Sequence, residues 1–435
     1  MSLNKSPLSL KISLHSPSIV GIGGSYLISL RKNLERKTPF FYPMKIATPY
    51  LSNLTPLRGI AALLTVIFHV DLMLGMGGDL LLKFKDSFLI NRMYLMVDFF
   101  FVLSGFIMMH VYGRWFADAV SGSEFKRFTI ARFARVYPLH FVTLLYCIGL
   151  KIVTLSSNAP ANPMDIVSND FKAIPSHLLL LHSMNVNQWF TWNNASWSIS
   201  TEWWMYMLFP FLVKPFFKLG SLGRTMVVLS CFAGYLAITF WIVPIVTEPA
   251  SMPFVRVDPA LLSINVSYQY GFLRCLFGFV LGMVIYLGYQ QNWGKSWLAN
   301  GYTFLGLTFG LALCLHLAVP DVFSVAFFPL MLLSAAYGSR NMDTFFGSTP
   351  LQRLGDWSFS IYLVHQPLMY TIQAIMTLTA PPNAAGPPPK PDMLTGWLIC
   401  LGFVGITLGV SYLTYRFVEV PARRWINKSG RVISA

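Results

Sequence analysis

The sequence predicts an all-α protein that crosses a membrane about ten times, with both termini in the cytoplasm. Of its 435 residues, 55% are hydrophobic and only 11% are charged, whereas soluble domains carry about 25% charged residues. Apolar segments recur from Leu57 to Tyr415, and most approach the roughly 20 residues that a transmembrane helix needs. The net charge of +15 therefore indicates a basic cytoplasmic face, and no nucleic-acid partner is expected.

Ten segments have the length and composition of membrane spans. They cover residues 56–76, 93–113, 136–154, 203–222, 225–246, 268–290, 302–319, 322–339, 357–378 and 394–415. The short link Val319–Asp321 predicts a tight hairpin between two of them. The stretch "APPNAAGPPPKPD" (380–392) predicts a loop, because each proline removes a backbone donor.

The distribution of lysine and arginine orients these spans. If the N-terminus is cytoplasmic, the inside segments hold 23 of the 32 basic residues and the outside loops hold six. Lysine and arginine accumulate in cytoplasmic loops, so this asymmetry predicts that both termini are cytoplasmic. The outside loops are short, and no sizeable extracellular domain is expected.

Three parts are expected along the chain. Residues 1–50 are an extension that is either disordered or a mis-called start, with Met44 as the alternative first residue. The apolar run Ile19–Leu30 is too short and glycine-rich to span, and basic residues follow it, unlike in a signal peptide. Residues 51–425 form the transmembrane domain and 426–435 a cytoplasmic tail. The five cysteines lie singly, so no metal site is predicted.

Ionisable residues within the spans point to a polar cavity. A charged side chain at the bilayer centre costs at least about 2.5–3.5 kcal/mol, so it usually faces a partner or a water-filled space. In "LRGIAALLTVIFHV", Arg58 and His69 are eleven residues apart, which at about 100° per residue places both on one helix face. Arg58 is expected at the cytoplasmic mouth and His69 in the outer half. Taken alone, His69 fits a structural hydrogen bond as well as a catalytic role.

The second and third spans add polar groups at defined depths. Asp98 lies near the outer end of its span, and the small pair Ser104 and Gly105 lies midway, where a ligand or simply another helix can approach closely. Arg132 and Arg135 lie one turn apart at the start of the third span. Planar guanidinium groups suit bidentate phosphate binding, although the same pair also fits a cytoplasmic charge anchor.

The later spans contain three further ionisable groups. Glu202 follows Trp197 at the outer edge of the fourth span, where tryptophans also form interfacial belts. Arg274 is buried in the sixth span, so a carboxylate or an anionic ligand is expected beside it, and Asp98 or Glu202 is predicted to compensate it. His365 lies near the middle of the ninth span. Together these residues predict a cavity open to the outside with an arginine-rich cytoplasmic entrance.

These motifs, in this order, resemble those of the membrane-bound acyltransferase 3 family, the polytopic O-acyltransferases of bacterial cell-surface glycans. The resemblance runs from about Leu54 to Trp425. It rests on "LRGIAAL…FH", "DFFFVLSGFIM", "ARFARVYP", "WSISTEWW", "LGDWSFSIYLVHQPL" and "FVEVPARRW". Some members append a soluble SGNH-type hydrolase domain after the last span. Only a short tail follows here, so a stand-alone acyltransferase of the bacterial cytoplasmic (inner) membrane is expected.

The resemblance implies transfer of an acyl group, commonly acetyl, from cytoplasmic acyl-CoA to a hydroxyl of an exported or lipid-linked glycan, in contact with membrane lipid. It implies that His69 is a general base or a transient acyl carrier, because an imidazole near neutrality can accept a hydroxyl proton. Glu202 is expected to orient His69 or to bind sugar hydroxyls. The expected site comprises a catalytic group of His69, Glu202 and Asp98, a donor-binding group of Arg58, Arg132, Arg135, Ser104 and Gly105, and an acceptor-binding group of Arg274, His365 and Trp197.

A transporter or flippase for a glycolipid or small anion is the alternative. Ten spans with intramembrane charges suit a carrier equally well. The sequence shows no inverted repeat, however, and its arginine pair is expected at the cytoplasmic mouth rather than at the midplane. The loops 155–196 and 247–267 are expected to shape the acceptor site, but they do not identify the acceptor, and the oligomeric state is open.

Overall fold

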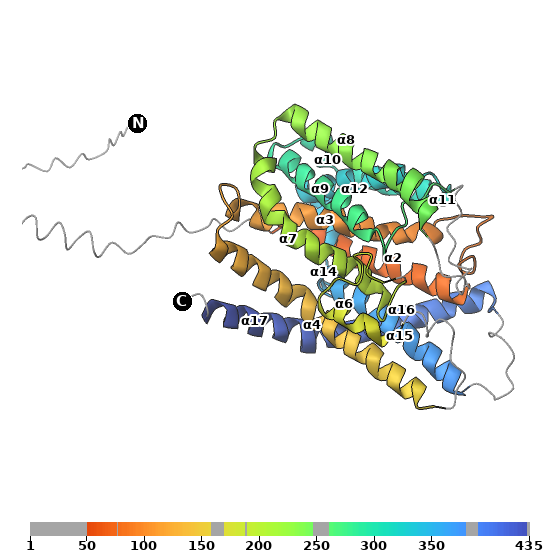
Figure 1. Cartoon of the computed structure of the whole chain (residues 1–435). Coiled ribbons are helices and arrows are strands. Elements are labelled where there is room, and N and C mark those ends of the chain that lie inside the picture. The colour runs from red at the N-terminus through yellow and green to blue at the C-terminus, as the bar shows by residue number, and fades with distance from the viewer. Residues whose placement is uncertain are drawn as a thin grey trace, which may run out of the picture. The chain divides into compact units, whose positions relative to one another are not determined.

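The computed structural model describes residues 50–75, 77–157, 169–187, 189–246, 261–379 and 390–432. Within these residues every regular element is helical (Figure 1), so the all-α prediction is confirmed. The extension before Tyr50, including Met44, lies outside the described residues. So do parts of both loops expected to shape the acceptor site and the proline-rich stretch from 380 to 389.

Each of the ten predicted spans contains an α-helix within the described residues. These helices are α2 (Leu54–Leu74), α3 (Met96–Tyr112), α4 (Gly122–Leu155), α7 (Trp197–Phe217), α8 (Ser221–Ala237), α9 (Gly271–Gln290), α11 (Gly301–His316), α12 (Asp321–Tyr337), α15 (Ser358–Thr379) and α16 (Met393–Thr414). Shorter elements between and after them include η1 (Asn91–Leu95), α6 (Ile174–Leu178), η4 (Asn194–Ser196), α10 (Lys295–Leu298), α13 (Arg340–Phe346), α14 (Thr349–Asp356), η9 (Tyr415–Glu419) and α17 (Val420–Val432).

By length and composition, six helical stretches of the described chain can cross a membrane. They are Leu54–Leu74, Asn91–Trp115, Gly122–Leu155, Ser221–Ile245, Gly271–Gln290 and Met393–Ser429. A seventh is added if α12 and α13, which meet at 96°, count as one broken span. The polytopic membrane class is therefore supported, whereas the count of ten and the cytoplasmic position of the termini stay predictions.

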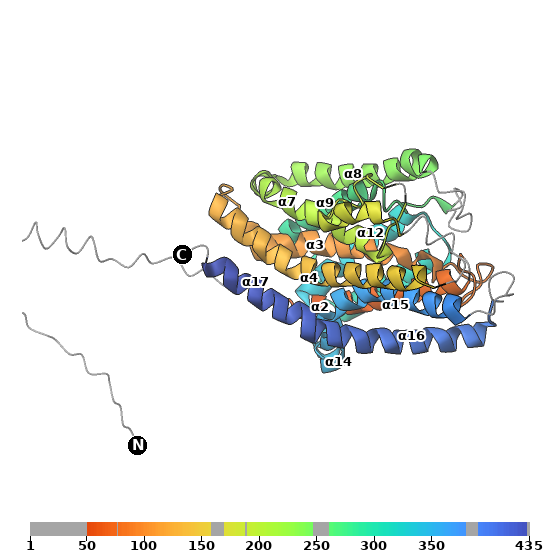
Figure 2. The same ribbon diagram turned by 60° about the horizontal axis from the view of Figure 1, so that its bottom comes forward.

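Helices α3 and α9 form the centre of the bundle because glycines let their backbones touch. An added Cβ at Gly105 would lie 1.9 Å from the Phe279 carbonyl oxygen, and one at Gly282 would lie 1.9 Å from the Val102 carbonyl oxygen. Small residues at helix interfaces allow this close approach in membrane bundles. Figure 2 shows α3 between α8 on one side and α16 on the other.

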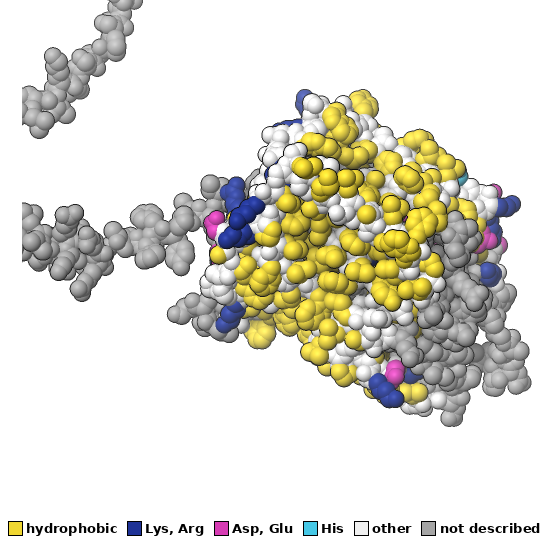
Figure 3. Space-filling model, turned by 45° about the horizontal axis from the view of Figure 1, so that its top comes forward, with side chains coloured by type: hydrophobic (Ala, Val, Ile, Leu, Met, Phe, Trp, Pro, Cys, Tyr) yellow, Lys and Arg dark blue, Asp and Glu magenta, His cyan; other side chains and the backbone are white. Residues whose placement is uncertain are grey.

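The outer helices present large apolar side chains to their surroundings. Exposed examples are Phe240, Trp241, Leu305, Phe309, Leu398 and Leu401. Figure 3 shows hydrophobic side chains covering one face, with lysine and arginine gathered at its margins. A soluble monomer rarely exposes an apolar patch of this kind, so this surface fits contact with lipid.

The long helix α4 carries several of the residues that matter below. Its N-cap is Ser121, whose hydroxyl accepts a hydrogen bond from the Glu124 backbone N–H at 3.2 Å, and Glu124 adds negative charge to the first turn. The helix continues through Pro138, whose ring removes one backbone donor. The helix is nevertheless unbroken from Arg132 past His140.

Candidate active site

A cavity of about 170 Å³ lies among α2, α3, α4, α7 and α15. Five of the predicted site residues line it, namely Arg58, Ser104, Arg132, Arg135 and Glu202. Phenylalanine, leucine, isoleucine and tyrosine side chains make up most of the remaining wall. The structure thus brings three guanidinium groups and one carboxylate from three helices, α2, α4 and α7, to a single, largely apolar cavity.

Two of the arginines are held in place by neighbours. Arg132 Nη2 donates a hydrogen bond to the Tyr112 hydroxyl at 2.7 Å, and its guanidinium carbon lies 4.9 Å from the centre of the Tyr112 ring. Arg135 Nη1 donates to Glu419 Oε2 at 2.8 Å. Ser360 donates to the other oxygen of the same carboxylate at 2.5 Å. Stacked and paired guanidinium groups lose little freedom on binding a phosphate.

Sequence reasoning missed Glu419. This residue lies in η9, where the last apolar helix ends, and its side chain is buried. The segment "FVEVPARRW" contained a signal, because an acidic residue directly after an apolar span usually pairs with a cation or faces water. Nothing in that segment pointed to Arg135, which lies 284 residues earlier in the chain.

Glu202 belongs to a compact polar group on the cavity wall. Its Oε1 accepts hydrogen bonds from Ser104 Oγ and from the Tyr206 hydroxyl, each at 2.5 Å. The Ser104 and Tyr206 oxygens are 3.2 Å apart. Glu202 was expected to orient His69 or to bind sugar hydroxyls. The role of Glu202 stays a prediction. The structure shows no contact between Glu202 and His69 among the described residues: the carboxylate accepts from Ser104 and Tyr206, and a different residue contacts His69.

That residue is His365. Its Nε2 lies 3.3 Å from His69 Nδ1, with the two ring centres 4.9 Å apart. His69 Nδ1 also lies 2.9 Å from the Thr65 carbonyl oxygen. Because a carbonyl oxygen only accepts hydrogen bonds, this contact assigns the proton of neutral His69 to Nδ1 and the lone pair to Nε2. His69 is therefore in the tautomer whose Nε2 can act as a base.

The histidine pair adjoins the cavity without lining it. Tyr362 is part of the cavity wall, its ring centre is 5.9 Å from that of His365, and its hydroxyl accepts a hydrogen bond from Ser198 at 2.8 Å. Helix α2 thus carries Arg58 on the cavity wall and His69 just beyond Tyr362. That Arg58 and His69 share one face of α2 stays a prediction, since only Arg58 lines the cavity.

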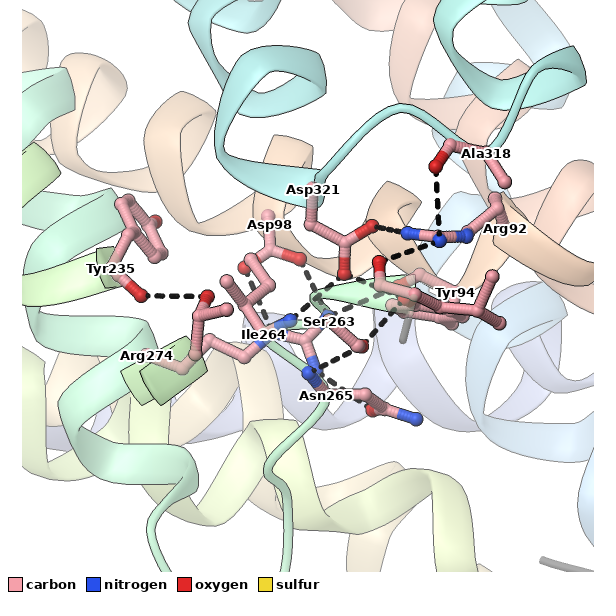
Figure 4. A network of polar contacts seen from close by, with 12 residues as sticks. Arg92, Tyr94, Asp98, Tyr235, Ser263, Ile264, Asn265, Arg274, Ala318 and Asp321 are labelled. Carbon is pink, nitrogen blue, oxygen red and sulfur yellow. Dashed lines mark hydrogen bonds and ion pairs between the residues drawn. The ribbon is translucent and has the colours of Figure 1, made fainter. Parts of the chain in front are cut away.

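Asp98 and Arg274 form an ion pair outside this cavity (Figure 4). Arg274 donates to both carboxylate oxygens, through Nε at 2.8 Å and Nη2 at 2.5 Å, and the two side chains are 1% and 0% exposed. Of the two partners predicted for Arg274, Asp98 is the one present. The Trp197 ring centre lies 5.5 Å from the guanidinium carbon. Asp98 and Trp197 both contact Arg274, and none of these three residues lines the cavity.

The same network contains residues that sequence reasoning missed. Arg92 forms a buried ion pair with Asp321, and the Tyr94 hydroxyl donates to the other oxygen of Asp321 at 2.6 Å (Figure 4). The Tyr94 carbonyl oxygen in turn accepts from Arg274 at 3.3 Å. Arg92 and Asp321 lie at the ends of short connections, where charged residues usually face water, so the sequence carried no signal of their burial.

Gly105 serves packing rather than the cavity. The Phe279 carbonyl of α9 occupies the space where its Cβ would stand. Two interpretations were open for the pair Ser104 and Gly105, the approach of a ligand or the approach of another helix. Each residue fits one of them. Ser104 lines the cavity and Gly105 admits a neighbouring helix.

A second cluster of ionisable groups was also missed. His140 of α4, His177 of α6 and His182 lie together, and all three are buried. Burial, reinforced by the nearby His140, lowers the pKa of His182 to about 3. Burial also holds the pKa of His177 well below its usual range. His177 and His182, which lie on the connection between α4 and α7, are therefore neutral at pH 7, the form of imidazole that binds metals.

Comparison with known proteins identifies the family of the chain. A family model described as an acyltransferase domain matches residues 52–416. The acyltransferase MdmB of Streptomyces mycarofaciens is 32% identical over 62% of this chain and 66% of its own length. The peptidoglycan O-acetyltransferase OatA of Listeria monocytogenes serovar 1/2a is 21% identical over 86% of this chain and 56% of its own length.

Protein 2 in the picA locus of Rhizobium radiobacter is 36% identical over 22% of this chain and 47% of its own length. The chain thus spans about half to two thirds of the length of the relatives it matches. No solved structure matches it significantly. Because the family model covers most of the sequence, the chain belongs to the acyltransferase domain family.

Proposed function

We propose that the protein is an integral-membrane O-acyltransferase that moves an acyl group from acyl-CoA to a hydroxyl of an exported or cell-surface glycan in the bacterial cytoplasmic membrane. The observation that carries this proposal is that Tyr362, in the wall of an arginine-lined cavity, packs against His365, which in turn contacts His69. The activity printed for OatA supports acetyl as the acyl group and a glycan as the acceptor.

The donor fits the cavity by charge and by shape. Arg58, Arg132 and Arg135 offer three guanidinium groups, which suit the phosphates of CoA. The aromatic and aliphatic wall suits an acyl chain and the thioester arm, which carry no charge. Glu202, hydrogen-bonded to Ser104 and Tyr206, provides the polar group midway along this wall.

His69 supplies the base. Its Nε2 accepts the proton of the acceptor hydroxyl while that oxygen forms a bond to the thioester carbonyl carbon. The carbon–sulfur bond then breaks, CoA leaves as a thiolate, and the proton from His69 restores its thiol. His365, in contact with Nδ1 of His69, positions the ring. In this scheme Asp98 and Arg274 are architectural rather than catalytic or acceptor-binding.

The test is release of CoA thiol from acetyl-CoA by the purified full-length chain in lipid nanodiscs, with and without glycan acceptor. His69→Ala should lower kcat at least about 100-fold, the usual scale for a lost general base. Arg132→Gln and Arg135→Gln should raise KM for acetyl-CoA with a smaller change in kcat. Arg353→Gln, at an exposed position on α14, is the matched control and should leave both constants unchanged.

Two results would contradict the proposal. One is normal CoA release by the His69→Ala protein. The other is the finding that the wild-type protein neither binds nor cleaves acyl-CoA but moves a glycolipid or an anion across vesicles, which would favour the transporter.

A further inference from the structure

The three buried histidines His140, His177 and His182 share an unusual hydrogen-bond pattern. His140 Nε2 lies 3.1 Å from the His177 carbonyl oxygen, and His182 Nε2 lies 3.0 Å from the Ser196 carbonyl oxygen. His177 Nε2 lies 2.7 Å from the Thr191 hydroxyl. Carbonyl oxygens only accept, so His140 and His182 carry their protons on Nε2 and their lone pairs on Nδ1.

These contacts use the Nε2 atom of each ring and leave the three Nδ1 atoms. Each is buried and makes no hydrogen bond of good geometry among the described residues, although the Ser176 backbone lies near the His182 ring. The side chains of His140, His177 and His182 are 1%, 0% and 4% exposed, so bulk water does not satisfy these atoms. Buried polar atoms without a partner are rare in folded proteins, and three in one place call for an explanation.

A bound cation explains all three atoms at once. A histidine that ligates a metal usually donates its other ring N–H to a carbonyl, carboxylate or hydroxyl oxygen, which fixes the tautomer and the ring orientation. This is the pattern found at His140, His177 and His182. One ring nitrogen of each also lies within 4.8 Å of one ring nitrogen of the others.

We propose that His140, His177 and His182 bind one divalent transition-metal ion, Zn²⁺ by preference, through their Nδ1 atoms. Three neutral imidazoles form a known zinc ligand set and leave a fourth position for water. Within the part of the chain that the structure describes, the cluster contains no carboxylate, the ligand type that suits magnesium or calcium.

Binding requires the rings to reorient, because nearly parallel rings do not direct their in-plane lone pairs at one point. They are stacked nearly parallel, with interplanar angles of 4° to 7° and the centres of His177 and His182 3.9 Å apart. A tetrahedral ion at about 2.0–2.1 Å needs ligand nitrogens about 3.3 Å apart, each with its lone pair directed at the ion. The rings must therefore tilt out of their parallel stack, and nitrogens that lie up to 4.8 Å apart must close by up to about 1.5 Å.

The ion would attach the segment between α4 and α7 to α4, as a clamp. His140 lies on α4, whereas His177 and His182 lie on the connecting segment. That segment also carries Asn193, whose Nδ2 donates to Thr143 of α4 at 3.2 Å and to the Leu363 carbonyl at 2.9 Å. The clamp thus holds the connection that leads into α7 and contacts α15 two residues from His365. Its role is structural, and it adds no step to acyl transfer.

The test measures metal in the full-length protein, purified through a tag without histidines. We expect close to one zinc per chain by mass spectrometry, and a tetrahedral visible spectrum after replacement of zinc by Co²⁺. Restoring Zn²⁺ to chelator-treated protein should raise its unfolding temperature. Wild-type protein that contains no stoichiometric metal and is not stabilised by added Zn²⁺ would overturn the proposal, whatever the variants do.

Variants then locate the site. A glutamine amide nitrogen can take the place of His Nε2–H while removing Nδ1, so His140→Gln and His182→Gln keep their bonds to carbonyl oxygens and lose only the proposed ligand atom. Each should lower zinc content at least about tenfold. His316→Asn, at a histidine bonded to Ser87 through Nδ1, is the control and should retain the metal. Unchanged zinc content in both glutamine variants would show that the metal is bound elsewhere.

Discussion

The buried ion pair of Asp98 and Arg274 allows the sharpest test of the described architecture. Arg274→Met leaves the Asp98 carboxylate fully buried without its cation, and Asp98→Leu leaves the guanidinium in the same position. Breaking such a pair from one side costs about 3–5 kcal/mol, because an uncompensated charge stays in a low-dielectric interior. We therefore expect each single variant to lower the free energy of unfolding by that amount.

The double variant should recover most of this loss. With Arg274→Met and Asp98→Leu together, no charge is left unpaired, and replacing a buried pair by apolar residues is often neutral or stabilising. The carbonyls of Tyr94 and Val266 and the side chain of Asn265 still lose the donor that Arg274 gave them, at about 1 kcal/mol each. The coupling free energy between the two sites should therefore be at least about 2 kcal/mol.

The assay is unfolding of the purified variants by SDS in mixed micelles, followed by the fluorescence of the 12 tryptophans. Asp118→Asn, at an exposed carboxylate, is the control and should change the free energy of unfolding by less than about 0.5 kcal/mol. Single variants that cost less than about 1 kcal/mol and add up in the double variant would refute the reasoning. If acyl transfer also returns in the double variant, Arg274 is architectural; if it stays absent, Arg274 contacts the substrate.

Two further variants test the packing and the donor site. Gly105→Ala forces a Cβ to 1.9 Å from the Phe279 carbonyl, so it should destabilise the protein by about 1–3 kcal/mol or more, whereas Gly402→Ala, with open space around it, should be neutral in the same unfolding assay. Glu419→Gln removes the charge that holds Arg135 at 2.8 Å and should raise KM for acetyl-CoA several-fold with little change in kcat; an unchanged KM would show that Arg135 acts independently of Glu419.

Much of the fold and part of the site could be predicted because they depend on local pattern. Apolar runs define helices wherever the solvent is lipid, since every backbone group must then be satisfied within its own helix. Helical periodicity placed Arg58 and His69 on one face of α2, and the structure puts the first on the cavity wall and the second beyond Tyr362. The pairing of Asp98 with Arg274 followed from the cost of an isolated charge.

The remaining contacts depend on which helices become neighbours, and periodicity does not specify this. Glu202 was expected to orient His69 or to bind sugar hydroxyls, and the side chain that contacts His69 is His365, because α15 rather than α7 supplies it. The partner of Arg135 is Glu419, from the far end of the chain.

The sequence by itself determined the membrane class, the positions of the helices and the set of polar residues that could not face lipid. The tertiary structure decided how those residues were grouped. Arg58, Arg132 and Arg135 share one cavity, His69 pairs with His365, and three histidines meet beside α4. The physical reason is that a polar group buried in an apolar bundle must find a partner, but any helix of the bundle can supply that partner.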